Sequence, residues 1–237
     1  MRALNDSDFL GLWESGSRRH PLDQALLTLG VAFPEAAPED LAFWPLGRRN
    51  RELIELYCRY FGSKLSGFTT CTDCGEKLEV EVDGRALAGA GPAREGEGGP
   101  MIDFQGEKFR VPTTRDLAGV AREENPRVAA VRLIEGCRVG AGGRDAWTDN
   151  DLAEIGERLA GADPLAEIRL RLRCPECGRE EDQVLDLVAF FWAEIDARVR
   201  RLLRDIHTLA SAYGWGEREI LSLTESRRAL YLEMVQT

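Results

Sequence analysis

Two Cys-x-x-Cys-Gly motifs, at residues 71–75 and 174–178, constrain the fold of this chain more than any other feature. Each motif lies between short segments in which apolar and polar residues alternate, as they do in β-strands. These segments are 65–70 and 78–82 for the first motif, and 168–173 and 183–187 for the second. Glycine supplies the positive φ angle that a tight turn beneath a metal ion needs. The sequence therefore predicts two β-hairpins, each with two cysteines at its tip.

The four cysteines of these motifs have the spacing of a zinc site. Four thiolates suit one tetrahedral Zn²⁺ in a closed structural site, because no coordination position is left for water or substrate. The predicted ligands are Cys71, Cys74, Cys174 and Cys177. Two disulfides or free thiols are the alternatives, but neither motif begins a helix after a strand, where a redox cysteine would be activated. The long separation of the two motifs requires an inserted subdomain between them.

Composition limits the classes of protein to consider. With 237 residues and 43% hydrophobic content, the chain can bury a substantial core. Its net charge of −10, from 41 acidic and 31 basic side chains, disfavours binding to nucleic acid. No apolar run approaches the ~20 residues of a membrane span, and no hydrophobic stretch of a signal peptide follows residues 1–6. We therefore expect a cytoplasmic protein, because thiols in the cytoplasm remain available to metal.

The expected fold class is α+β: a mostly helical protein around a split four-cysteine zinc ribbon, with a small α+β insert between its two hairpin knuckles. Composition and periodicity divide the chain into six segments. These are an N-terminal helical segment (1–64), a first zinc knuckle (65–86), a flexible glycine-rich loop (87–100), the α+β insert (101–165), a second zinc knuckle (166–187) and a C-terminal helical segment (188–237).

Apolar periodicity predicts helices in three of these segments. The expected ranges are 5–14, 22–33 and 48–60 before the first knuckle, 113–121, 126–137 and 152–159 in the insert beside a hairpin at 101–111, and 187–213, 217–221 and 225–235 at the end of the chain. The helix at 187–213 carries the longest apolar stripe, and Phe190, Trp192 and Leu203 broaden it. A helix with so wide an apolar surface is expected to contact two partners, within the chain or outside it.

The order of these features resembles the T4-like baseplate hub assembly chaperones and baseplate proteins of contractile phage tails and extracellular contractile injection systems. The likeness lies in the two knuckles, the segment Pro-Thr-Thr-Arg-Asp-Leu at 112–117, and above all the end of the chain. The residues that carry it there are Trp215, Glu219, Ile220, Leu221, Leu223, Arg227, Arg228, Tyr231, Leu232 and Val235. One departure is Thr72, where the family often has proline.

The resemblance implies structural zinc at the four cysteines and a C-terminal helical segment that docks on baseplate or tail proteins. Aromatic and aliphatic side chains in that segment are of the type that anchors interfaces. The expected partner-binding residues are Trp215, Leu221, Leu223, Arg227, Arg228, Tyr231 and Leu232. The two arginines fit equally well on a solvated helix face. Such a protein would act in the cytoplasm or become part of an assembled injection particle.

Two other classes of function compete with an assembly role. A hydrolytic zinc site needs an open position and usually histidine or carboxylate ligands, whereas His20 and His207 are the only histidines and are expected to cap or pack. Cys58 and Cys137 stand alone and are expected to be buried. A zinc-ribbon adaptor or nucleic-acid-associated regulatory protein is the alternative, with arginines in 169–179 and 198–204 as its candidate basic surface. We favour a non-enzymatic structural or assembly protein without a small-molecule substrate.

Overall fold

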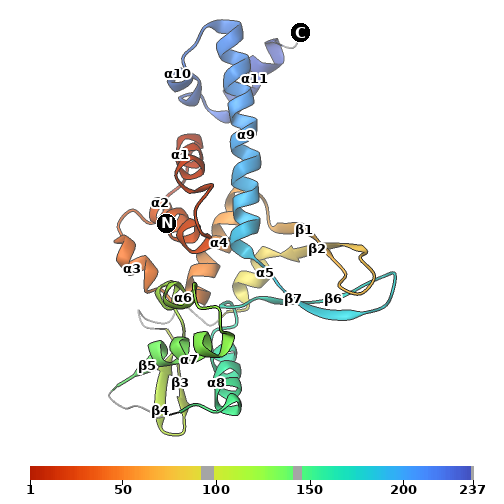
Figure 1. The fold of residues 1–237 in the computed structure, drawn as a ribbon. Coiled ribbons are helices and arrows are strands. Elements are labelled where there is room, and N and C mark those ends of the chain that lie inside the picture. Colours follow the sequence, from red (N-terminus) through yellow and green to blue (C-terminus); the bar gives the residue numbers. More distant parts are fainter. Residues whose placement is uncertain (92–98, 141–145, 236–237) are drawn as a thin grey trace. The chain divides into compact units, whose positions relative to one another are not determined.

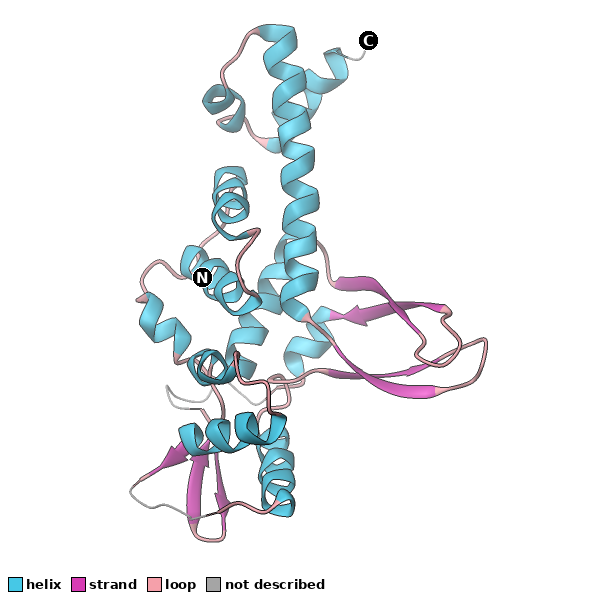
Figure 2. Ribbon diagram, viewed as in Figure 1, coloured by secondary structure: helices cyan, strands magenta, loops and turns pink. Residues whose placement is uncertain are grey.

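The computed structural model describes residues 1–91, 99–140 and 146–235. Helices take up about 56% of the chain and the sheets are small and antiparallel, which confirms an α+β protein that is mostly helical (Figures 1 and 2). In the described ranges, no helix has both the length and the apolar character that crossing a membrane requires. The chain forms two compact units, residues 1–34 together with 191–237, and residues 35–190.

The helices and strands are labelled in Figure 1. Those of the first unit are α1 (Asp6–Gly16), α2 (Pro21–Ala32), α9 (Leu187–Tyr213, which starts at the end of the second unit), α10 (Glu217–Leu221) and α11 (Glu225–Val235). Those of the second unit are α3 (Pro38–Ala42), α4 (Leu46–Tyr60), β1 (Lys64–Thr70), β2 (Lys77–Asp83), α5 (Gly84–Gly89), β3 (Met101–Phe104), β4 (Glu107–Arg110), α6 (Thr114–Val120), α7 (Pro126–Cys137), β5 (Arg138–Val139), α8 (Asp149–Ala162), β6 (Arg169–Arg173) and β7 (Glu180–Val184).

Most predicted elements are present, and the differences have local causes. Helices α7, α9, α10 and α11 have the predicted bounds. Helix α3 and strand β5 were not predicted, because five and two residues are too short to show a period. Strand β7 begins at Glu180, three residues before the predicted segment, since its first three residues are charged and carry no apolar signal.

The glycine-rich loop predicted at 87–100 begins later than expected. Its first residues belong to α5, whose N-terminus is capped by the side chain of Asp83 accepting hydrogen bonds from the N–H groups of Arg85 and Ala86. Residues 92–98, the centre of that predicted loop, lie outside the described residues. The cap explains why a segment rich in alanine and glycine starts as a helix.

The insert between the two hairpins has its own apolar core. Strands β3, β4 and β5 form one antiparallel sheet, and Phe104 and Phe109 project from it into a cluster with Trp147. Val111, Ile134 of α7, and Ile155 and Leu159 of α8 complete the buried part of this cluster. Because these side chains pack on one another, the insert has a source of stability separate from the hairpins.

Buried polar contacts attach the insert to α4. The N–H of Gly47, in the first turn of α4, donates a hydrogen bond of 2.8 Å to the carboxylate of Asp163, which is 2% exposed. A Cβ atom on Gly47 would lie 1.6 Å from that carboxylate, so only glycine allows the contact. The side chain of Asn50 donates to the carbonyl of Leu165 at 2.7 Å. These bonds fix the end of the insert, from which the chain enters β6.

The first unit is held together by contacts between α1 and α9. The indole N–H of Trp13 donates a hydrogen bond of 2.8 Å to the carboxylate of Asp196. The ring of Trp192 lies so close to Gly16 that a Cβ atom there would be 2.1 Å from it. Part of the broad apolar face of α9 therefore packs against α1 within the chain.

A buried ion network connects the two ends of the chain within this unit. The carboxylate of Asp6, at the start of α1, accepts hydrogen bonds from Arg198 of α9 at 2.9 Å and from Arg228 of α11 at 2.7 Å. The side chain of Arg228 is only 5% exposed. Burial by itself would raise the pKa of Asp6, but the bonds from Arg198 and Arg228 hold it below its usual value.

We predict that Asp6→Asn destabilises the first unit by roughly 3 kcal/mol, because it leaves the buried guanidinium of Arg228 with only the more distant carboxylate of Asp205, 3.7 Å from its Nε. Chemical denaturation followed by circular dichroism measures the change. Asp23→Asn is the matched control, since Asp23 also lies in the first turn of a helix but is exposed. Equal losses from the two substitutions would show that the helix dipole, and not the ion network, is responsible.

The same network predicts the acid sensitivity of this unit. A carboxyl group whose pKa is lowered by folding contributes stability that is complete above its unfolded pKa of about 3.9 and is lost as the pH falls through the lower folded value. We therefore expect the C-terminal helices to loosen below about pH 4. In Asp6→Asn this part of the acid transition should be missing, which a pH titration followed by circular dichroism tests.

Candidate metal centre

The two hairpin tips have the same backbone structure. In the first, the N–H of Cys71 donates to the carbonyl of Glu76 and the N–H of Gly75 donates to the carbonyl of Cys71. In the second, Cys174 makes the corresponding bonds with Arg179 and Gly178. Both glycines have the positive φ angle that the motif predicts, +76° for Gly75 and +74° for Gly178. Local sequence therefore gives two equivalent turns.

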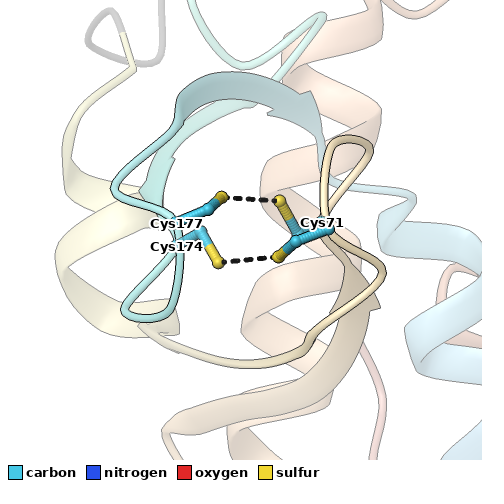
Figure 3. A group of neighbouring side chains, drawn as sticks. Cys71, Cys174 and Cys177 are labelled. Atoms are coloured by element: carbon cyan, nitrogen blue, oxygen red, sulfur yellow. Dashed lines mark hydrogen bonds between the residues drawn. The ribbon is translucent and has the colours of Figure 1, made fainter.

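The four cysteines, far apart in the sequence, meet at these tips. Their Sγ atoms all lie within 4.8 Å of one another. The two pairs drawn in Figure 3 each join one hairpin to the other: Cys71 and Cys177 are 3.7 Å apart, and Cys74 and Cys174 are 3.6 Å apart. The arrangement could hold a metal ion, as the spacing of the motifs indicates.

The sulfur distances fit a tetrahedral cation and not a pair of disulfides. All four cysteines are free, and the two separations between the hairpins are much longer than the S–S distance of about 2.05 Å in a disulfide. Four sulfurs around a cation at about 2.3 Å form a regular tetrahedron with edges of about 3.8 Å. The measured 3.6 and 3.7 Å separations are close to that edge. Cys71 and Cys174 are buried while Cys74 and Cys177 are exposed, so an ion could enter from the side of the latter two.

The thiols influence one another's ionisation. The backbone N–H groups of Cys74 and Asp73 donate towards the sulfur of Cys71 and lower its pKa to about 7. The N–H of Glu76 also favours the thiolate of Cys74, but desolvation and the neighbouring sulfurs raise the pKa of Cys74 to about 12. The protein alone therefore favours one thiolate over several. A bound dication would stabilise all four, which couples metal binding to proton release.

Side chains next to the sulfurs also join the two hairpins. The hydroxyl of Thr72 donates a hydrogen bond of 2.6 Å to the carboxylate of Glu181, and this bond is the main reason why the pKa of Glu181 is lowered. The hydroxyl of Thr69 donates to Gln183 at 2.5 Å. Thr72 thus makes a contact between the hairpins that proline at this position could not make. Sequence reasoning missed these bonds because no local pattern relates residues so far apart.

The expected partner-binding residues are close together but mostly occupied. Trp215, Leu221, Tyr231 and Leu232 are partly buried against a cluster formed by α9 and α10. Their aromatic rings pack with Tyr213: its ring centroid lies 4.6 Å from that of Trp215 and 5.8 Å from that of Tyr231. These side chains therefore form the core of the C-terminal segment. Their partly exposed edges are what remains for a partner.

The other three expected partner-binding residues differ in environment. Leu223 is partly buried, and Arg227 is exposed with its guanidinium 3.3 Å from the hydroxyl of Tyr231. Arg228 is buried in the ion network described above, so it does not lie on a solvated helix face and is not available to a partner. The sequence gives a signal for the burial of Arg228, because it shares one helical face with the apolar residues 231, 232 and 235.

Sequence reasoning also missed the most exposed apolar side chains of α11. Leu230 is 56% exposed and Met234 is 64% exposed, and the spacing of four places them on one face of the helix. The sequence gives a signal for this, because a second apolar face appears when the hydrophobicity of the two sides of the helix is compared. Leu230 and Met234 form an exposed apolar face of α11 within the described residues.

Several arginines of the basic surfaces considered for nucleic acid are paired with nearby carboxylates. Arg171 lies 3.2 Å from Asp182 across the second hairpin, and Arg179 lies 3.6 Å from Asp73. On α9, Arg200 is paired with an acidic residue one turn before it. A surface that binds phosphate needs cations that are free to replace counterions, and these arginines already have acidic neighbours.

The isolated cysteines and histidines lie away from the sulfur cluster. His20 caps α2, its Nδ1 accepting a hydrogen bond from the N–H of Leu22, as its position before proline predicts. His207 is exposed on α9. Cys137 is buried, as expected, and burial raises the pKa of its thiol to about 12, while Cys58 is only partly buried.

No protein-family model, curated protein or solved structure matches this chain. The geometry of the site therefore has to be interpreted by its own chemistry.

We predict that the protein binds one thiophilic divalent cation per chain. Reconstitution with Co²⁺ should give the sulfur-to-metal charge-transfer absorption of a four-thiolate site, with one equivalent bound. Cys74→Ser together with Cys177→Ser should abolish this absorption, because two of the four ligands are lost. Cys58→Ser is the control, since Cys58 is a partly buried cysteine outside the cluster. Full binding by the double variant would contradict the site.

Proposed function

We propose that this chain is a non-enzymatic structural or assembly protein whose two hairpins form a zinc ribbon around one structural Zn²⁺. The observation that carries the proposal is the group of four cysteine sulfurs within 4.8 Å of one another. Four protein ligands complete a tetrahedral shell, so a zinc ion there would have no open position for water or substrate. Such a site stabilises a fold and does not carry out hydrolysis.

The donor set supports a thiophilic cation such as zinc over cations that prefer oxygen ligands. Thiolate ligands favour Zn²⁺, Cu⁺ or iron, and disfavour Mg²⁺ and Ca²⁺, which prefer oxygen. A single tetrahedral four-thiolate site is common to zinc and iron, and zinc in such sites is structural. In the cytoplasm, where we propose that the protein is made, the cysteines remain reduced and free to bind it.

The proposed setting is the baseplate or tail of a contractile injection system, on the resemblance of the knuckles and of the C-terminal segment to that family. The protein would bind baseplate or tail subunits through the C-terminal segment, during assembly or as part of the particle. The paired arginines favour this role over the zinc-ribbon adaptor or nucleic-acid-associated regulator. A net charge of −10 also favours protein partners.

Removal of the metal tests the structural role of the ion. We expect chelation to increase hydrogen exchange in β1, β2, β6 and β7, because a two-stranded hairpin is marginally stable by itself. Hydrogen exchange in the apolar core around Phe104 and Phe109 should change little, since none of the four cysteines belongs to that core. Hydrogen-exchange mass spectrometry resolves the two regions. Addition of Zn²⁺ should restore protection, and unchanged hairpins after complete chelation would refute the structural role.

The apolar face of α11 provides the test of partner binding. Leu230→Asp together with Met234→Asp should leave the fold intact, because both side chains are exposed, yet prevent co-purification with tail or baseplate subunits from the native host. Loss of two anchoring side chains typically costs ~2 kcal/mol or more in binding. Circular dichroism and metal content verify that the variant is folded.

Val128→Asp together with Val139→Asp is the matched control, since it also replaces two exposed apolar residues by acids, in the second unit. The control should co-purify like the original protein. Retention of tail subunits by the α11 variant would place the docking surface elsewhere, and capture of no tail protein by the original chain would remove the baseplate assignment.

A further inference from the structure

A small cleft in the second unit has an unusual lining. It has a volume of about 260 Å³ and lies between the residue that follows α3 and the pair of helices α6 and α7. Its lining residues are Phe43, Arg110, Arg115, Asp116, Gly119, Val120, Arg132 and Gly136. Three guanidinium groups and a single carboxylate make the cleft positive, although the chain as a whole is strongly acidic.

Two of the three arginines have structural partners. Arg110 forms a two-bond ion pair with Asp116, with Nη–Oδ distances of 2.6 and 2.8 Å, and also donates to the carbonyl of Gly136 at 2.7 Å. Arg132 lies 2.9 Å from a carboxylate oxygen of Glu123, which is outside the cleft. The charges of these two arginines are therefore largely balanced.

Arg115 is the cation that remains available. In the described part of the chain, no carboxylate lies within ion-pair distance of it. Its guanidinium carbon lies 5.0 Å above the ring centroid of Phe43, which orients the cation at the edge of the cleft. Phe43 itself is 51% exposed. An exposed aromatic ring beside an unpaired arginine is a combination typical of residues that dominate binding energy at protein interfaces.

The shape of the cleft favours a side chain over a cofactor. Its volume is below the ~300–1,000 Å³ of typical small-molecule pockets. The wall contains Gly119, where an added Cβ atom would meet nothing within 4 Å, so the space beside α6 is open. A narrow, open, positive cleft with an aromatic edge matches an extended segment that carries a carboxylate next to an apolar side chain.

We infer that this cleft is a docking site for a short acidic segment of a partner protein. A carboxylate of the segment pairs with Arg115, and an adjacent apolar or aromatic side chain packs on Phe43. The charge of the cleft selects an anion, and the exposed ring selects an apolar neighbour for that anion. The site is independent of the proposed baseplate role, because it is defined by the lining of the cleft and not by the C-terminal segment or the metal.

The experiment uses the full metal-loaded chain and a fluorescein-labelled peptide in which Asp and Glu alternate with Leu and Phe. Fluorescence anisotropy should show binding that weakens as salt is added. Arg115→Glu should weaken it by about tenfold or more, because the paired charge becomes repulsive. Phe43→Ala should weaken it several-fold through loss of the apolar contact. Arg59→Glu, an exposed charge reversal on α4, is the control and should leave binding unchanged.

A second pair of variants tests the location through the cleft itself. Gly119→Glu places a carboxylate four residues after Arg115 on α6, within reach of its guanidinium, and should compete with the peptide. Gly119→Gln adds a side chain of the same size without the charge and should weaken binding less. Both replace glycine inside a helix, which favours folding, and thermal denaturation verifies this.

Competitors distinguish the class of ligand. A peptide with Lys in place of the acidic residues should not bind, and inorganic phosphate or a single-stranded oligonucleotide should displace the acidic peptide only at concentrations where salt does the same. Selective displacement by phosphate or by the oligonucleotide would overturn the inference. So would the absence of peptide binding, or equal binding by the Arg115→Glu and Arg59→Glu variants.

Discussion

The meeting of four cysteine sulfurs is the contact on which the hairpin region depends. Each hairpin has only two strands, and a two-stranded sheet alone is marginally stable in water. The strands are also strongly charged: β7 contains Glu180, Glu181 and Asp182 among its five residues. On the first hairpin Leu65, Leu78 and Val80 are buried, and Leu78 packs against Cys71 and Cys174, whereas neither strand of the second hairpin contains a buried residue. For the second hairpin, the sulfurs and the hydrogen bonds beside them take the place of a core.

For the sulfurs to meet, the chain between the hairpins must leave and return at nearly the same place. The polar contacts of α4 achieve this. The N–H of Leu46 donates to the carbonyl of Pro112 near the start of the insert, and Gly47 binds Asp163 at its end. The insert can then have its own core while its two ends remain fixed on one helix. A long insertion is compatible with a cysteine cluster split between two hairpins for this reason, because the cost of closing a loop grows slowly with its length.

The first unit uses its charged and aromatic residues in a different way. Arg228 and Arg198 share the carboxylate of Asp6, so residues from both ends of the chain meet in one buried network. Trp215 and Tyr231 pack on each other with ring centroids 4.9 Å apart. Residue types that are typical of interfaces are thus part of the internal packing here, and the exposed apolar surface lies on the neighbouring face at Leu230 and Met234. Residue type alone does not separate these two uses.

The sequence by itself determined the features that depend on neighbouring residues. The two Cys-x-x-Cys-Gly turns, the long helix α9 and the bounds of α7, α10 and α11 follow from glycine geometry and from helical periodicity, both of which act over a few residues. Only the tertiary structure decided which distant groups meet: Thr72 with Glu181, Gly47 with Asp163, and Arg228 with Asp6. The physical reason is that these contacts join residues more than a hundred positions apart, and no local propensity of the chain encodes such a pairing.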